Sequence, residues 1–125
     1  MAKARGPAPG LTHLRVTFTD DFYMGPGRAD LLEFIAETGS ISAAGKRMGM
    51  SYKRAWSLVQ ALNDGFGAPL VEASRGGSGQ GGAVLTPDGT AVLRHYRAME
   101  AATRRAIAPD AAALQKRLGD ISRKK

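Results

Sequence analysis

The stretch that most constrains the fold runs from residue 39 to residue 62 and reads GSISAAGKRMGMSYKRAWSLVQAL. A serine just before a helix accepts a backbone N–H two or three residues on, so Ser40 or Ser42 can begin a first helix. Gly49 can adopt the left-handed conformation that ends a helix, and Ser51 can cap a second one. The pattern therefore predicts two helices joined by a tight turn.

Two capped helices joined by a short turn that contains glycine are typical of a helix-turn-helix, whose second helix enters the major groove of DNA. In the predicted second helix, residues 51–64, apolar side chains recur at helical spacing and would face a core. This stripe consists of Ala55, Leu58, Val59, Leu62 and Phe66. A cationic amphipathic helix packed in any small bundle remains an alternative at this point.

The opposite side of the same helix carries side chains that bond phosphates and base edges or stack on them. We expect Trp56 on this side to buttress the helix against the edge of the core, although its ring could also touch the sugar–phosphate backbone. With Ser42 from the preceding helix, the predicted DNA-contacting residues here are Ser42, Ser51, Tyr52, Lys53, Arg54, Ser57 and Gln60.

Composition narrows the classes of function. A chain of 125 residues with 43% hydrophobic content suits one globular domain. The absence of cysteine excludes disulfides and thiolate chemistry, and the two histidines, His13 and His95, lie too far apart to suggest a metal site. A net charge of +7 favours nucleic acid as a partner. No apolar run is long enough for a membrane span or a signal peptide, so we expect a cytoplasmic protein.

The segment before the two helices contains a strand and a further helix. Residues 1–10 are rich in Ala, Gly and Pro and are expected to form a flexible tail. Alternating apolar residues predict a strand over 14–19, and the FYMGPG stretch at 22–27 predicts a turn. A helix is expected over 28–38, ended by Gly39, which completes a core of three helices.

A glycine-rich hairpin follows the second helix. Residues 70–74 and 83–86 are predicted strands, and between them lies RGGSGQGG. We interpret this loop, 75–82, as a wing in which Arg75 and Gln80 contact DNA, with a plain hairpin as the alternative. GSGQGG also matches G-x-G-x-x-G, but a strand follows it where a dinucleotide site needs a helix, so no nucleotide site and no enzymatic activity are expected.

A long helix is expected to follow the hairpin. Thr86 can cap it, Pro87 suits its first position, and it is predicted to run to residue 108. A seam at spacings of four and three predicts an interface with a second copy, although the helix could instead pack on its own core. The seam residues are Val92, Leu93, Tyr96, Met99, Thr103 and Ala106.

The remaining charged residues are assigned to the surface. Arg94, Arg97, Arg104 and Arg105 are expected on a solvated face, with phosphate contact as the alternative. Pro109 is expected to begin a separate short helix, and the 109–125 segment ends in a basic tail.

The combination of these motifs resembles a known family. SYK and AW at the start of the second helix, together with GGSGQGGAVLT at 76–86, are similar to the DNA-binding half of ModE-type molybdate-responsive transcription regulators, itself like the winged helix-turn-helix of LysR-type regulators. The resemblance covers about residues 11–107. It implies a homodimer that binds operator DNA. The oxyanion-binding domains that follow in full-length members have no counterpart here, so we expect no molybdate site within this chain.

The sequence therefore predicts a mainly α fold with a small β wing, in which residues 11–86 form a winged helix-turn-helix and residues 87–108 a dimerisation helix. We expect a transcription regulator that binds double-stranded DNA as a homodimer, on an inverted-repeat operator, without a cofactor or metal. The alternative is a small basic protein that binds DNA or RNA without sequence preference.

Overall fold

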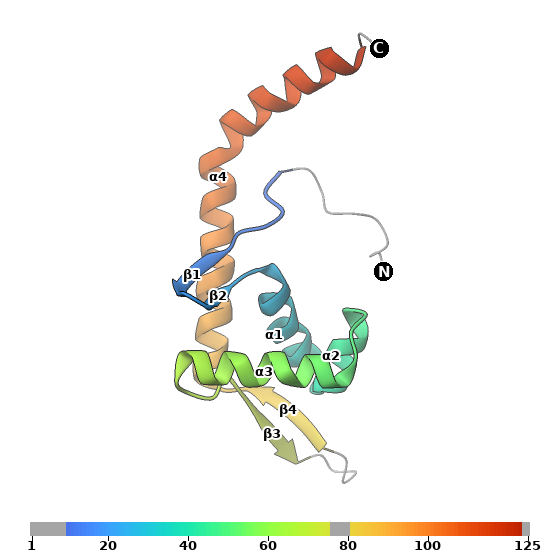
Figure 1. Ribbon diagram of the computed structural model, residues 1–125, viewed down its shortest axis with the longest axis vertical. Helices are drawn as coiled ribbons and strands as arrows, with labels where there is room; N and C mark the ends of the chain where they lie inside the picture. The colour runs from blue at the N-terminus through green and yellow to red at the C-terminus, as the bar shows by residue number, and fades with distance from the viewer. Residues whose placement is uncertain (1–9, 76–80, 124–125) are drawn as a thin grey trace.

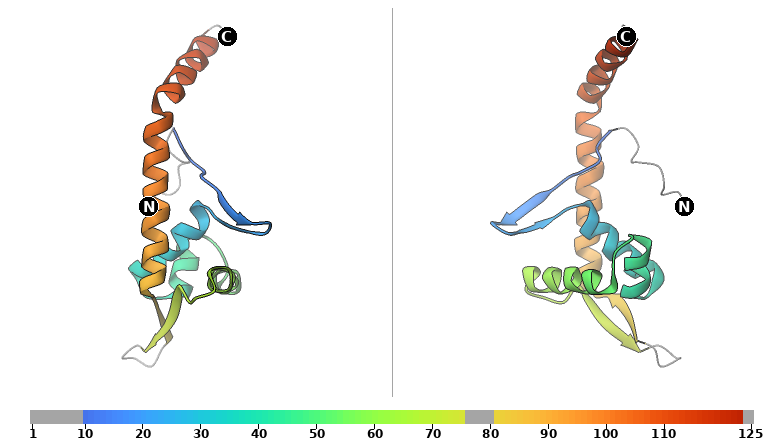
Figure 2. Two further views of the ribbon diagram at one scale, coloured as in Figure 1. Left: turned by 90° about the vertical axis from the view of Figure 1, so that its left-hand side faces the viewer. Right: turned by 45° about the vertical axis from the view of Figure 1, so that its right-hand side comes forward.

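The computed structural model describes residues 10–75 and 81–123. The predicted tail at 1–9 and the middle of the predicted wing loop lie outside these residues. Figure 1 shows a body of short helices and two hairpins, from which one long helix extends well beyond the rest of the chain. The two further views in Figure 2 confirm that the C-terminal half of this helix stands clear of the body. The fold is mainly helical with a small β wing, as predicted.

The N-terminal segment forms a hairpin, where the sequence indicated a strand followed by a turn. Strand β1 (Val16–Thr19) pairs antiparallel with β2 (Phe22–Met24), with Val16 opposite Met24. The prediction that 22–27 is only a turn was wrong, because its first three residues complete this ladder. Phe18 and Phe22 of the hairpin stack around Phe66, with ring centroids 5.1 to 6.1 Å apart, so the hairpin is held on the third helix.

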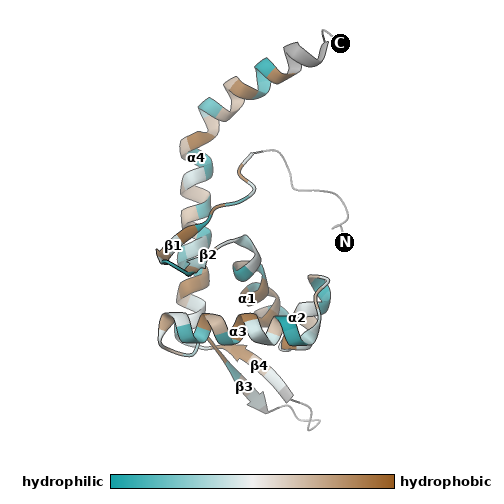
Figure 3. Cartoon of the chain, viewed as in Figure 1, coloured by the Kyte–Doolittle hydropathy of each residue, from teal (hydrophilic) through white to brown (hydrophobic). Residues whose placement is uncertain are grey.

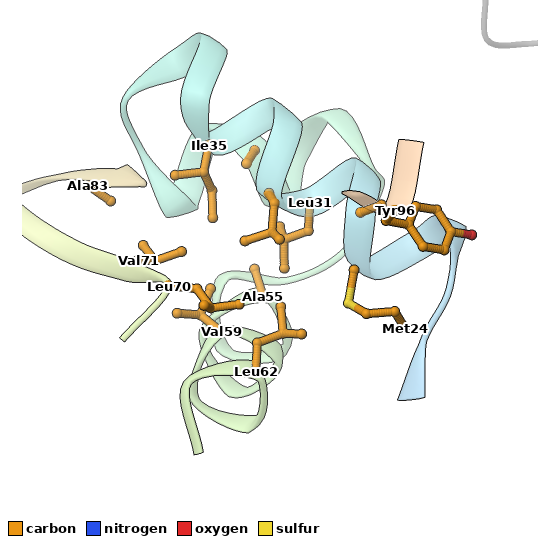
Figure 4. Close-up of a cluster of buried hydrophobic side chains, with 13 residues drawn as sticks. Met24, Leu31, Ile35, Ala55, Val59, Leu62, Leu70, Val71, Ala83 and Tyr96 are labelled. Carbon is orange, nitrogen blue, oxygen red and sulfur yellow. The ribbon is translucent and has the colours of Figure 1, made fainter. Parts of the chain in front are cut away.

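Three helices form the centre of the body: α1 (Pro26–Thr38), α2 (Ile41–Arg47) and α3 (Tyr52–Phe66). Their buried side chains meet in one cluster, which Figure 4 shows between the helices, the wing and the long helix. Leu31, Leu32 and Ile35 of α1 have no exposed surface. Burial of such side chains stabilises a fold by roughly 1.5–3 kcal/mol each, so α1 is the central support of the body.

The wing is an antiparallel pair, β3 (Val71–Arg75) and β4 (Gly81–Leu85), with Val71 opposite Leu85 and Arg75 opposite Gly81. The predicted strands lay within two residues of these bounds. Ala83 of β4 is buried, and Val71 of β3 is nearly so, which joins the base of the wing to the helical core.

The long helix α4 runs from Pro87 to Arg123. The Thr86 hydroxyl accepts a hydrogen bond from the N–H of Gly89 at 3.0 Å, so Thr86 is the predicted cap. The prediction of a separate helix after residue 108 was wrong, since Pro109 lies inside α4. A proline there removes one backbone hydrogen bond and crowds the preceding turn, which bends a helix rather than ending it when the flanking residues are good helix formers. Figure 1 shows such a bend in α4.

No helix in the described part of the chain is long and apolar enough to cross a membrane. Figure 3 shows hydrophobic and hydrophilic residues interspersed along α4.

Candidate nucleic-acid interface

The turn between α2 and α3 sets the position of the candidate recognition helix. The hydroxyl of Ser40 accepts the N–H of Ala43 at 3.0 Å, so Ser40, rather than Ser42, caps α2. Gly49 has a φ of +70°, the left-handed conformation predicted for it. Gly45 lies close to α3, since a Cβ on it would come within 3.0 Å of the Cβ of Ala55. The short side chains here let the two helices cross closely.

Helix α3 separates an apolar side from a polar side, as its sequence predicted. The hydroxyl of Ser51 accepts the N–H of Arg54 at 3.1 Å and caps the helix. Ala55, Val59 and Leu62 are buried against the core, whereas Leu58 and Phe66 are half-buried at its edge. The other side of the first two turns is exposed: Tyr52, Lys53, Arg54, Trp56 and Ser57.

Two sets of hydrogen bonds fix the wing relative to α3. The Asn63 side-chain oxygen accepts the N–H of Leu70 at 2.7 Å and that of Val71 at 3.3 Å, and its amide donates to the carbonyl of Val71. On the other strand, the N–H of Ala83 donates to the carbonyl of Gly39 at 2.9 Å. The wing is therefore tied to α3 and to Gly39, the residue that ends α1 just before α2 begins.

A groove of about 510 Å³ lies between α3, the start of α2 and the wing. It brings together three of the predicted DNA-contacting residues, Ser42, Tyr52 and Gln60. Trp56 lines it as well, beside Glu72 and Ala73 of β3. The groove is open on its outer side, where hydrogen-bonding and aromatic side chains of α3 stand opposite the wing.

The sequence and the fold match a known class of proteins. The model of the lysR family of bacterial regulatory helix-turn-helix proteins matches residues 28–90. These residues include α1, α2, α3, the wing and the start of α4. The chain belongs to this family.

Named relatives of this LysR-family chain include regulators. It is 53% identical over 78 residues to the molybdenum-pterin-binding protein MopB of Rhodobacter capsulatus, across 62% of this chain and 29% of MopB. It is 40% identical over 83 residues to the DNA-binding transcriptional dual regulator ModE of Escherichia coli K12, across 66% of this chain and 32% of ModE. The chain thus spans about a third of the length of these relatives. The predicted resemblance to ModE-type regulators is confirmed.

A solved structure supports the same assignment. The chain is similar to the crystal structure of a CbnR_DBD–DNA complex, with a TM-score of 0.55 and 32% sequence identity. The match covers 70% of this chain and 95% of the CbnR chain. The family, the named relatives and this complex together identify residues 28–90 as a helix-turn-helix of the kind found in bacterial regulators that bind DNA.

The other residues predicted to contact DNA are not among those that line the groove. Lys53 and Ser57 are exposed on the outward side of α3. Arg54 instead lines a smaller hollow of about 190 Å³ with Arg28 and Leu58, on another side of α3. Arg75 ends β3, but its side chain lies outside the described part of the chain, as does the whole of Gln80.

Trp56 does not have the role that the sequence suggested. Its side chain is 45% exposed, and it belongs neither to the buried core cluster nor to the residues packed against that cluster. The prediction that it buttresses α3 was wrong, because the apolar side of the helix is already covered by Ala55, Val59 and Leu62. Helical periodicity places Trp56 on the polar side of α3, and this was the sequence signal for its place in the groove.

The first turns of α4 pack on the core of their own chain. Tyr96 is 1% exposed, and its hydroxyl donates to the carbonyl of Leu14 at 2.6 Å. Its assignment to a seam between copies was therefore wrong, since its own chain covers it. Val92 and Leu93 are half-buried against the same core. Of the other predicted seam residues, Met99 and Ala106 are exposed and Thr103 is half-buried.

Arg97 fastens α4 to α1. It forms ion pairs with Asp30 and Glu33 of α1 at 2.8 Å and with Glu100 at 3.0 Å. Burial lowers the pKa of its guanidinium, but the hydrogen bonds with the three carboxylates outweigh this and raise the pKa above its usual value. The assignment of Arg97 to a solvated face was wrong, whereas Arg94, Arg104 and Arg105 are exposed as predicted.

Proposed function

We propose that this chain acts as a homodimer on an inverted-repeat DNA operator, with α3 in the major groove and the wing on the backbone or minor groove. The observation that supports this most directly is the groove between α3 and the wing, because it borders the exposed polar side of α3. The proposal includes a cytoplasmic location, no enzymatic activity and no molybdate site in this chain.

The polar residues of α3 and α2 offer different hydrogen-bonding chemistry to DNA in this proposal. Gln60 in the groove presents an amide that can bond both the N6 and N7 edges of adenine. Lys53 and Ser57 lie on the exposed side, where an ammonium and a hydroxyl suit guanine edges or phosphates. Ser42 approaches from α2 on the opposite side of the groove.

The homodimer is supported by the uncovered surface of α4. Beyond the residues that pack on its own body, α4 exposes Met99, Leu114 and Leu118, the last two at 69% and 58%. A helix of this length with exposed leucines is stabilised when a second copy covers them, and most homo-oligomers have two-fold symmetry. Two-fold symmetry in the protein requires an inverted repeat in the DNA.

The test is to select bound duplexes from a random DNA pool with the whole chain. Recovery of an inverted repeat is the expected result and would establish specificity and dimer symmetry together. Recovery of unrelated sequences would instead support a basic protein that binds without sequence preference.

Two matched variants test the role of α3. Lys53→Ala and Lys116→Ala each remove one positive charge, the first from α3 and the second from the exposed end of α4. Lys53→Ala is expected to weaken binding to the selected duplex by roughly 1–3 kcal/mol, and Lys116→Ala by much less. Equal losses would mean that net charge, and not α3, carries the binding.

A further inference from the structure

Two aromatic side chains of α3 have no aromatic partner among the residues that the structure describes. The protein has four phenylalanines, three tyrosines and one tryptophan. Most of these rings stack on one another or lie beside an arginine: Phe18, Phe22, Tyr23, Phe34, Phe66 and Tyr96. Within residues 10–75 and 81–123, Tyr52 and Trp56 have neither kind of contact.

Tyr52 and Trp56 both line the groove. They are four residues apart, which places them on one side of α3, one turn from each other. Tyr52 is 55% exposed and Trp56 is 45% exposed, and both line the groove beside Gln60. The groove therefore offers two large apolar rings next to a side chain that forms hydrogen bonds.

The chemistry of a base edge indicates what such rings contact. In the major groove, the four bases present hydrogen-bond donors and acceptors, and thymine adds a C5-methyl group. The indole N–H of Trp56 and the hydroxyl of Tyr52 can form hydrogen bonds at the edges of their rings, but the ring faces cannot satisfy those donors and acceptors. A ring face instead gains free energy when it covers a methyl group and both lose contact with water. Thymine is thus the base that two uncovered rings in this groove favour.

We propose that Trp56, with Tyr52 beside it, contacts thymine methyl groups and selects A·T pairs at defined operator positions. The inference rests on the proposed function, because it requires α3 to enter the major groove. It assigns Trp56 to specificity and not to the stability of the fold. The alternative contact for the two rings is the deoxyribose of the DNA backbone, and that contact would not depend on the identity of the base.

The methyl group can be removed without changing base pairing. In operators recovered from the random pool, each thymine is replaced in turn by uracil, which lacks only the C5-methyl. At the contacted positions, binding is expected to weaken about fourfold per methyl, the equivalent of about 0.8 kcal/mol for one buried carbon group. Because Trp56 is the single tryptophan of the chain, its fluorescence is also expected to change when the thymine operator binds.

Variants connect this methyl effect to the two rings. Trp56→Ala is expected to bind with equal affinity whether thymine or uracil occupies the position that Trp56 contacts, and to keep the far-ultraviolet circular dichroism of the parent. Tyr52→Ala tests the second ring in the same way. Phe18→Ala is the matched control, since it removes an aromatic ring that is 51% exposed on β1, outside the groove. It should retain the full difference between the two operators.

Three results would overturn the inference. They are equal binding of every uracil-substituted operator by the parent chain, a methyl effect that Trp56→Ala leaves unchanged at every position, and selected operators without a recurrent thymine. Each can occur while specific DNA binding is intact, so each is distinguishable from failure of the proposed function. Failure of the selection to yield any preferred sequence would reject both.

Discussion

The side-chain oxygen of Asn63 accepts the backbone N–H of Leu70 at 2.7 Å, which joins the last turns of α3 to the residue before the wing. The same side chain also bonds both backbone groups of Val71, the first residue of β3. Helix α3 and the wing are therefore connected by the side-chain amide of Asn63. The distance between the two sides of the groove depends on this amide and on the bond from Ala83 to Gly39.

Asn63→Ala should weaken both the fold and the groove. The substitution leaves the N–H groups of Leu70 and Val71 without their partner, which costs roughly 1–3 kcal/mol. Because the wing is then less firmly held, affinity for the selected operator should fall although no contacting residue has changed. Asn63→Asp, which keeps the acceptor and loses the donor, should destabilise the fold less, but its added negative charge in the groove should still weaken DNA binding. Urea denaturation and gel-shift titration measure the two quantities, and an unchanged affinity in Asn63→Ala would show that the amide does not position the wing.

Two glycine substitutions should have opposite signs. A Cβ on Gly89 would run into the carbonyl oxygen of Leu70, which belongs to a rigid backbone segment. Gly89→Ala should therefore lower the free energy of unfolding by roughly 1–3 kcal/mol, although alanine normally favours a helix more than glycine does. Gly27 in α1 has nothing within 4 Å of a Cβ, so Gly27→Ala should stabilise by about 0.4–1 kcal/mol. Thermal unfolding of both variants tests the difference, and stabilisation by Gly89→Ala would contradict the close approach.

Arg97→Met should loosen α4 from α1. The methionine keeps an apolar stem but loses the ion pairs with Asp30 and Glu33. The free energy of unfolding should fall by roughly 1–2 kcal/mol, a value kept low because the arginine side chain is 31% exposed to solvent. Arg47→Met is the control, since the ion pair of Arg47 with Glu37 is about half exposed and should contribute about 0–1 kcal/mol. Salt should reduce the difference between parent and variant. A larger loss in Arg47→Met than in Arg97→Met would refute the assignment.

Features that depend on local chemistry were predictable from the sequence. Ser51 caps α3 and Gly49 takes a positive φ because each needs only its near neighbours along the chain. The apolar stripe of α3 followed from helical periodicity alone. Thr86 begins α4 for the same local reason.

Features that depend on which elements meet in space were not predictable in this way. The strand signal of β2 is only three residues long and is followed directly by turn residues. Tyr96 fits the spacing of the predicted seam, but its hydroxyl donates to the carbonyl of Leu14 in the same chain. Asn63 carries no sequence signal for its bonds to Leu70 and Val71, and Arg97 carries none for its ion pairs with Asp30 and Glu33. These partners lie seven or more residues away along the chain. Trp56 was misassigned because periodicity gives the side of a helix but not what lies opposite.

Tyr96 should make the fold sensitive to alkaline pH. Burial, together with the negative charge of Glu100, raises the pKa of Tyr96 from 10.0 to about 12. The folded chain therefore holds the phenol neutral at pH values where an unfolded chain ionises it. The resulting stability is fully present below pH 10 and is lost as the pH rises from 10 towards 12, by on the order of 2 kcal/mol.

Tyr96→Phe separates this effect from packing. The phenylalanine keeps the buried ring but loses the hydrogen bond to the carbonyl of Leu14, so about 1 kcal/mol should be lost at pH 7. The same variant should lose less further stability than the parent between pH 10 and pH 12, because it has no phenol to ionise at this position. Urea denaturation at pH 7, 10 and 11.5 makes the comparison, with Tyr52→Phe as the control for an exposed tyrosine. Equal alkaline losses in Tyr96→Phe and in the parent would mean that other groups carry the pH dependence.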